Sequence, residues 1–325
     1  MEEEILVSIC CITYNHEEFI EDALKGFLNQ KVNFNYEILI HEDASTDRTA
    51  EILRRYEQKY PKLIKVIYQT ENQYSKSDFV SKFLYDISRA KYLAICEGDD
   101  YWVDENKLQK QVDFLEKNLD YSAYYHNVIV VDRNKNKFSE DQEIYKLYKT
   151  HTLKSEDINT GDVPGQTASL VYRNFWKDLN QESKEKFGKC KSNGDTKLAL
   201  FLNSIGKIYF SEDIMSHYRL TFDTDSWNSK MKNQNPCMYL FNGLFEIKTM
   251  LKEVLNIDYE PNLELLTRES FRFAVKSPTL KNIKTFIEIY RKCQNKNKIM
   301  IIIESILKKI KIIKEIKENN RPLLK

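Results

Sequence analysis

Hydrophobic and polar positions follow two different periods in the first part of the chain. Nearly continuous apolar runs of four to eight residues are typical of buried strands, and they occupy 5–12, 36–40, 64–68 and 92–96. Segments with an apolar residue at every third or fourth position are typical of amphipathic helices, and they occupy 17–28, 47–60 and 78–90. Strands that alternate with single helices predict an α/β fold whose sheet is mainly parallel and flanked by helices.

The pattern becomes less regular after position 96. We expect two more helices, at 107–119 and 196–203, and three more strands, at 123–131, 169–172 and 207–210. The span 132–162 is polar and irregular, and the pattern from about 238 onward is all helical. These changes predict an α/β domain over residues 1–230 and a helical C-terminal region over 231–325.

Composition narrows the class of protein. The 325 residues are 42% hydrophobic and carry a formal net charge of +1, which argues against a protein built to bind nucleic acid. Six cysteines without a C-x-x-C pair predict buried free thiols in a reducing compartment. The acidic start, Met1 to Glu4, lacks the basic segment of a signal peptide, and no apolar run approaches the length of a spanning helix. We therefore expect a cytoplasmic protein.

Polar side chains gather where three of the predicted strands end. These segments are Thr13–Asn15, His41–Asp47 and Glu97–Trp102. Each one alone is as compatible with a turn or a helix cap as with a ligand. Ligands of open α/β sheets bind beyond the carboxyl ends of the strands, so three such segments predict a binding site at that edge.

The acidic segment offers the most specific chemistry. Glu97, Asp99 and Asp100 fall within four residues, and Gly98 gives the backbone freedom between them. Carboxylates this close repel one another unless a cation or hydrogen-bond donors compensate. Mg²⁺ and Mn²⁺ favour carboxylate ligands together with substrate phosphates, so we expect a divalent metal here. The alternative is an acidic loop that only caps the next helix.

Three sequence blocks, taken together, resemble a known family. They are Val7–Asn15, Glu37–Thr49 and Tyr92–Trp102. In order and spacing they are similar to family 2 glycosyltransferases of the GT-A fold, of the kind that builds bacterial surface polysaccharides. The resemblance covers about residues 5–230 and implies that this part is the nucleotide-sugar-binding and catalytic domain.

The resemblance also implies roles for the first two segments. Thr13, Tyr14 and Asn15 correspond to residues that line the nucleotide pocket, and Tyr14 is placed to stack on a base. Asp43 corresponds to the acid that hydrogen-bonds the base, commonly uracil.

The family's Asp-x-Asp motif corresponds to Glu97-Gly98-Asp99. The resemblance implies that Asp99 ligates the metal and that Glu97 lies near the ribose or the metal. Glutamate replaces the first aspartate of the motif, and its longer side chain can still reach.

Later residues resemble the family's catalytic base and post-catalytic loop. Asp195 matches the second acid of the Glu-Asp motif, which takes the proton from the acceptor hydroxyl in a single, inverting displacement. A helix-capping role is compatible with this one. Arg219 is implied to pair with the diphosphate. His217 is either a metal or phosphate contact or a packed histidine, and Thr167 is a candidate to face the acceptor.

The segment 296–325 combines isoleucines with lysines in a basic amphipathic pattern. Such a helix can lie on an anionic membrane surface, or it can pack on its own domain or on a partner subunit.

The leading hypothesis is a metal-dependent inverting glycosyltransferase with Mn²⁺ or Mg²⁺ as cofactor. Its donor is a nucleotide-sugar, expected to be UDP-linked, and its acceptor a saccharide or lipid-linked saccharide at the inner membrane face. A nucleotidyltransferase of sugar phosphates would carry a glycine-rich basic loop, and none follows Ile12. A non-catalytic nucleotide- or sugar-binding module would not need Asp99 and Asp195 together.

Overall fold

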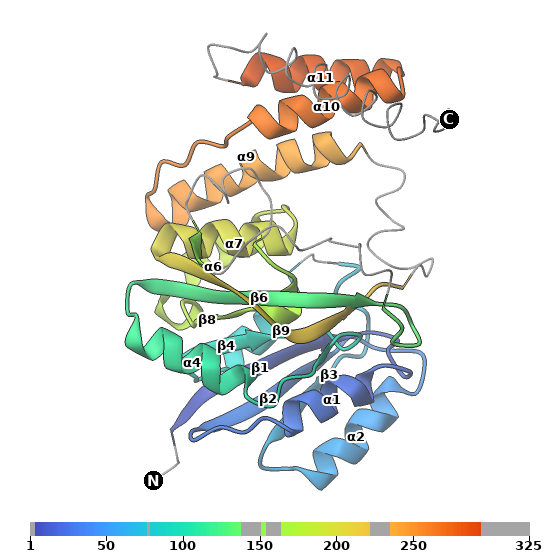
Figure 1. Cartoon of the computed structure of the whole chain (residues 1–325), viewed down its shortest axis with the longest axis vertical. Helices are drawn as coiled ribbons and strands as arrows, with labels where there is room; N and C mark the ends of the chain where they lie inside the picture. Colours follow the sequence, from blue (N-terminus) through green and yellow to red (C-terminus); the bar gives the residue numbers. More distant parts are fainter. Residues whose placement is uncertain (1–3, 77–78, 138–150, 154–163, 222–234, 294–325) are drawn as a thin grey trace, which may run out of the picture.

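One mixed sheet runs through the protein and decides where the polar strand ends lie (Figure 1). The computed structural model describes residues 4–76, 79–137, 151–153, 164–221 and 235–293. Within these residues the sheet has nine strands in the order β3-β2-β1-β4-β8-β6-β9-β5, and β7 pairs with β9. The strands are β1 (Ile5–Thr13), β2 (Asn35–Glu42), β3 (Ile64–Tyr68), β4 (Tyr92–Ile95), β5 (Tyr101–Trp102), β6 (Tyr121–Val131), β7 (His151–Leu153), β8 (Val171–Arg173) and β9 (Lys207–Arg219).

The strands β1, β2, β3 and β4 pair in parallel, so their carboxyl ends lie at one edge. Strand β8 pairs antiparallel to both β4 and β6 and thereby joins this parallel half to the long parallel pair of β6 and β9. The mixed, mainly parallel sheet expected from the sequence is confirmed.

Alternate residues of β1 point to two separate cores. Val7, Ile9 and Cys11 pack with the apolar residues of α1 (Ile20–Leu28), α2 (Thr49–Lys59) and α4 (Lys107–Lys117). Cys10 packs in the other cluster, which holds residues of α3 (Lys82–Ile87), α6 (Gln181–Lys189) and α7 (Gly194–Ile205). Burial on both faces explains why this strand is a continuous apolar run.

The C-terminal region is helical, as expected, and stacks beyond α7 in Figure 1. It comprises α9 (Pro236–Leu255), α10 (Glu264–Lys276) and α11 (Leu280–Lys292). Leu244, Ile247 and Leu251 of α9 are buried in the same cluster as Cys10 of β1. The boundary expected near residue 230 and the basic tail at 296–325 lie outside the described residues.

Several elements differ from the expected ones. Strand β9 continues to Arg219 instead of ending at 210, because it follows β6 through register shifts near His126 that polar residues conceal in the sequence. Residues 167–169 form a 3-10 turn, and β8 begins only at Val171. Helix α6 was not expected, since Phe187 is its one buried residue and a single apolar position shows no period.

All six cysteines are free and buried, as the sequence suggested. None of the helices in the described ranges combines the length and apolar character that a bilayer crossing requires.

Candidate active site

The loops after β1 and β2 are tied together by side-chain hydrogen bonds. Asn15 Oδ1 accepts a hydrogen bond from the backbone amide of Thr46 at 2.8 Å, and the backbone amide of Asn15 donates to Ser45 Oγ at 3.0 Å. The Glu17 amide donates to Asp47 Oδ2 at 2.9 Å. Asn15 also has a left-handed φ of 55°, an unfavourable backbone conformation that this network holds in place. Two of the three predicted segments, Thr13–Asn15 and His41–Asp47, are therefore joined into one continuous surface, which we call the wall of the site.

The third segment packs against β1 at a glycine. The Gly98 amide donates to the Ile12 carbonyl at 2.9 Å. A Cβ at this position would lie 2.6 Å from Thr13 Oγ1 and 2.9 Å from His16 Nδ1. Both of these atoms are buried and have no hydrogen-bond partner among the described residues. The close approach requires glycine and sets the Asp-x-Asp-like loop directly beside Thr13 and His16.

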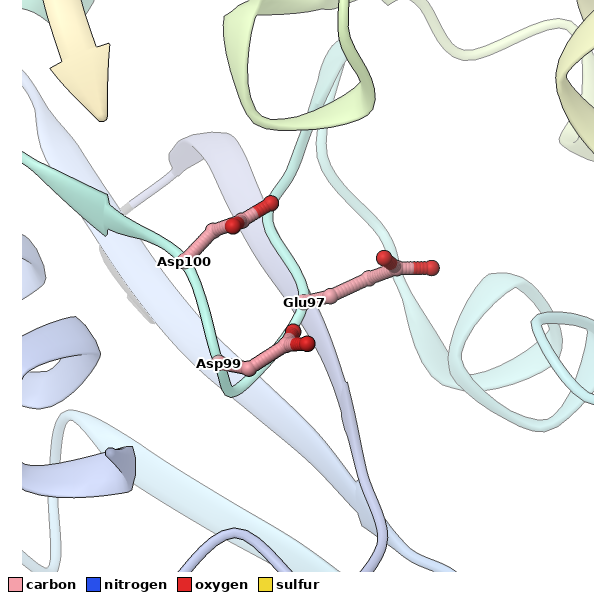
Figure 2. Close-up of side chains that lie close together, drawn as sticks. All are labelled: Glu97, Asp99 and Asp100. Carbon is pink, nitrogen blue, oxygen red and sulfur yellow. The ribbon is translucent and has the colours of Figure 1, made fainter. Parts of the chain in front are cut away.

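Glu97, Asp99 and Asp100 form the carboxylate cluster drawn in Figure 2, and one oxygen of each lies within 4.8 Å of the others. Burial of the carboxyl group and the charges of Asp99 and Asp195 raise the pKa of Glu97 to about 8. Glu97 is solvent-exposed as a residue, so water screens part of this shift, but its upward direction follows from the two like charges.

Asp100 is committed to the protein. Its side chain is fully buried, Oδ2 accepts from Gln166 Nε2 at 2.6 Å, and Oδ1 accepts from the Arg219 amide at 2.8 Å. Burial and the neighbouring acids raise its pKa well above the usual range. Asp99, in contrast, is 25% exposed, and its Oδ2 lies 3.9 Å from His16 Nε2. Of the three acids, Asp99 and Glu97 are thus the ones with accessible side chains, and their role as ligands of a divalent cation stays a prediction.

Asp195 reaches the same site from the first turn of α7. Asn193 caps this helix by accepting the Asp195 amide at 3.1 Å, and Thr167 Oγ1 donates to Asp195 Oδ1 at 3.1 Å. Burial raises the pKa of Asp195. Its charge contributes to the raised pKa of Glu97, so the two carboxyl groups lie in one electrostatic environment. Thr167 and the adjacent Gln166, which donates to Asp100, link Asp195 to the acidic loop, and the role of Asp195 as a base stays a prediction.

Asp43 is buried in the wall of this site, with 1% of its surface exposed. Its two oxygens accept the amides of Gln73 at 2.7 Å and Tyr74 at 3.0 Å, and His41 Nε2 lies 3.2 Å from Oδ1. Asp43 thus orders the loop after β3. Its contact with a nucleobase stays a prediction, as does stacking by the half-buried Tyr14.

Arg219 and His217 are also engaged with the protein. Arg219 is buried and donates to the Asp99 carbonyl and to Asp22, so its expected contact with a diphosphate stays a prediction. His217 Nδ1 lies 2.8 Å from the Tyr101 hydroxyl, and burial lowers its pKa. The histidine is therefore packed against Tyr101, and its contact with a metal or a phosphate stays a prediction.

The sequence did not single out His16, Asp22 or Gln166. Each acts through contacts with residues distant in sequence: His16 with Asp99, Asp22 with Arg219, and Gln166 with Asp100. His16 follows Asn15 directly, and this adjacency was the one available signal.

Comparisons with known proteins bear on the same segments. The sequence model of the family described as "Glycosyl transferase family 2" matches residues 8–178. An uncharacterized protein, Rv1520 of Mycobacterium tuberculosis (strain ATCC 25618 / H37Rv), is 41% identical over 167 residues, which cover 51% of this chain and 46% of that protein. The putative teichuronic acid biosynthesis glycosyltransferase TuaG of Bacillus subtilis (strain 168) is 32% identical over 128 residues, covering 39% and 49%. The matches thus span about half the length of these relatives.

A solved structure shares the fold at low identity. S. aureus TarS 1-349 in complex with UDP-GlcNAc superposes with a TM-score of 0.58 and 18% identity, over 88% of this chain and 80% of that one. The family match includes Asp43 and the Glu97–Asp99 loop and extends over more than half of the chain. The chain therefore belongs to glycosyl transferase family 2.

Proposed function

We propose that this protein is a metal-dependent inverting glycosyltransferase. It transfers a sugar from a UDP-linked donor to a saccharide or lipid-linked saccharide in surface-polysaccharide synthesis. The observation that carries the proposal is the link between Asp195 and the acidic loop: Thr167 donates to Asp195, and the adjacent Gln166 donates to Asp100, which clusters with Glu97 and Asp99. The name of TuaG, a putative teichuronic acid enzyme, supports the acceptor class, and the UDP-GlcNAc bound to TarS supports the donor class.

The residues divide the reaction between them. Asp99 and Glu97 would hold a divalent cation, which supplies positive charge that stabilises the departing diphosphate. Asp195 accepts the proton of the acceptor hydroxyl while the oxygen of that hydroxyl bonds to the anomeric carbon. The bond from that carbon to the diphosphate oxygen breaks at the opposite side, so the configuration inverts. The raised pKa of Asp195 makes it a stronger base once it is ionised.

The donor nucleotide is proposed to bind along the joined loops after β1 and β2. Thr13, Tyr14 and Asn15 line this wall, and Asp43 supports it from within. The Thr13 hydroxyl is buried beside Gly98 and supports the wall from behind.

Calorimetric titration of UDP with and without Mn²⁺ tests the proposal. We expect the wild-type protein to bind UDP far more tightly with Mn²⁺, and Asp99→Ala to lose this difference. Asp113→Ala is the matched control, since Asp113 is an exposed acid of α4 whose carboxylate accepts from Gln109. The control should behave as the wild type does. Absence of UDP binding in both conditions would contradict a UDP-dependent transferase.

We also propose that the helical region contacts the anionic inner face of the membrane. Helix α11 buries polar Asn282 and Thr285 but exposes 78% of Leu280, 39% of Ile283 and 40% of Ile287. These three apolar residues lie on one helical face by their spacing. Four exposed cations flank them, Lys281, Lys284, Arg291 and Lys292, against one exposed acid, Glu288. An apolar stripe with a basic rim complements anionic lipid, where each basic residue is worth about 1 kcal/mol.

Vesicle co-sedimentation tests this contact. The full chain should bind phosphatidylglycerol vesicles, and the double substitution Ile283→Asn with Ile287→Asn should lower binding about tenfold. Leu119→Asn is the control, because Leu119 is 74% exposed outside the helical region. Equal binding by the double variant would contradict the proposal. So would a dimer of the wild type that the double variant abolishes, since a second copy would then cover the stripe.

A further inference from the structure

Arg219 is the last residue of β9, and its guanidinium is enclosed. The side chain is completely buried, and the guanidinium carbon lies 4.5 Å from the centre of the Phe19 ring and 5.0 Å from that of Tyr101. A cation removed from water in this way needs a counter-charge. Asp22 of α1 supplies it, with Oδ2 2.9 Å from Arg219 Nη2.

The same arginine holds the acidic loop at two points. Its Nη1 donates to the Asp99 carbonyl, and its backbone amide donates to Asp100 Oδ1 at 2.8 Å. Gln166 fixes the other oxygen of Asp100. The backbone of the loop is thereby fixed from behind, while the Asp99 carboxylate remains partly exposed.

The pairing with Asp22 also decides what the guanidinium does not do. An arginine next to three carboxylates would be drawn to Asp99 or Glu97 if its charge were uncompensated. In the structure, Nη2 of Arg219 donates to Asp22 of α1, and Nη1 donates to the Asp99 carbonyl. Both terminal nitrogens are therefore engaged away from the carboxylates that face a cation.

We propose that Asp22 and Arg219 are positioning residues for the cation site, a role that rests on the proposed function. The pair fixes the Asp99 backbone and keeps the guanidinium off the Asp99 carboxylate, so that this carboxylate is available to Mg²⁺ or Mn²⁺. Neither residue needs to touch the donor for this role.

The test measures how much Mn²⁺ is needed to promote UDP binding in the full chain. Asp22→Asn keeps the shape of the side chain but removes the counter-charge. We expect its Mn²⁺ midpoint to rise about tenfold, the usual size of an effect on metal affinity from outside the ligand set. UDP affinity at saturating Mn²⁺ should change little. A general loss of structure would instead lower both the affinity for Mn²⁺ and the affinity for UDP. Asp22→Glu should restore part of the Mn²⁺ affinity.

Lys135→Ala is the matched control. Lys135 Nζ lies 2.8 Å from Asp22 Oδ1, so this variant removes the other partner of Asp22 and leaves the Arg219 contact in place. Its Mn²⁺ midpoint should match the wild type.

Two results would overturn the role. One is a folded Asp22→Asn protein with the wild-type Mn²⁺ midpoint. The other applies if Asp22→Asn does not fold: it is a wild-type Mn²⁺ midpoint in Arg219→Lys, which keeps the positive charge but lacks the two terminal nitrogens that hold the Asp99 carbonyl and Asp22. The wild-type arm separates this inference from the proposed function: no Mn²⁺ effect in the wild type overturns both, and equal effects in wild type and variant overturn only the positioning role.

Discussion

Asp195→Asn separates catalysis from binding at this site. Asparagine has the same shape, and its carbonyl can still accept the hydrogen bond that Thr167 donates at 3.1 Å. The variant therefore removes a charge and a base but not the local packing. General base catalysis contributes about 10²- to 10⁴-fold, so kcat should fall by that factor, or about 2.7–5.5 kcal/mol.

The affinity for the donor nucleotide should not fall together with kcat. The Asp195 charge helps to raise the pKa of Glu97, so its removal lowers that pKa and leaves Glu97 more fully ionised for a cation. UDP affinity in Mn²⁺ should be unchanged or slightly higher. The variant should also be at least as stable as the wild type. Folding raises the pKa of Asp195, so its ionisation destabilises the folded wild type as the pH rises above the pKa of the unfolded chain. Asparagine does not titrate and carries no such penalty.

The assay is release of UDP from a UDP-sugar in the presence of acceptor, with UDP calorimetry on the same samples. Near wild-type kcat in Asp195→Asn would refute the assignment of the base. A loss of UDP binding in a folded variant would show that Asp195 belongs to the donor site, which would also contradict this division of roles.

Three further substitutions test the packing beneath the site. Burial lowers the pKa of Lys107 to about 7. Between pH 7 and 10, the free energy of unfolding of the wild type in urea should therefore rise by about 1.4 kcal/mol per pH unit relative to Lys107→Met. Parallel curves of unfolding free energy against pH for the two proteins would refute this. Gly98→Ala, whose Cβ would lie 2.8 Å from Thr13 Cβ, should cost about 1–3 kcal/mol in thermal unfolding and weaken UDP binding, whereas Gly188→Ala, with 3.6 Å to its nearest neighbour, should not. Asp43→Asn places an amide donor against one of the two backbone amides at 73–74 and should cost about 1–3 kcal/mol, so an unchanged melting temperature would contradict the hydrogen bonds described.

The parallel half of the sheet was predictable because its elements are short and each follows from a local pattern. Strands β1, β2 and β4 consist mostly of buried residues and stop at the polar residues of the candidate site, so their sequences are apolar runs with polar ends. The second half was predicted less well. Strand β9 contains Glu212 and Asp213 within a strand of 13 residues, and its pairing with β6 carries it through this polar stretch.

The candidate site shows the same division. The sequence by itself determined that Glu97 and Asp99 follow a buried strand and that Asp195 lies at the start of a helix, because β4 and α7 follow from local periodicity. Only the tertiary structure decided that Asp195 shares the environment of Glu97, and that Asp100 is buried while Asp99 is open.

The same holds for the residues around the acids. Chain folding decided that Arg219 pairs with Asp22 and that α11 turns Ile283 outward while burying Thr285. Local periodicity reports how a residue relates to its neighbours along one element. Charge pairing, burial and exposure depend on which distant elements pack together, and no short stretch of sequence contains that information.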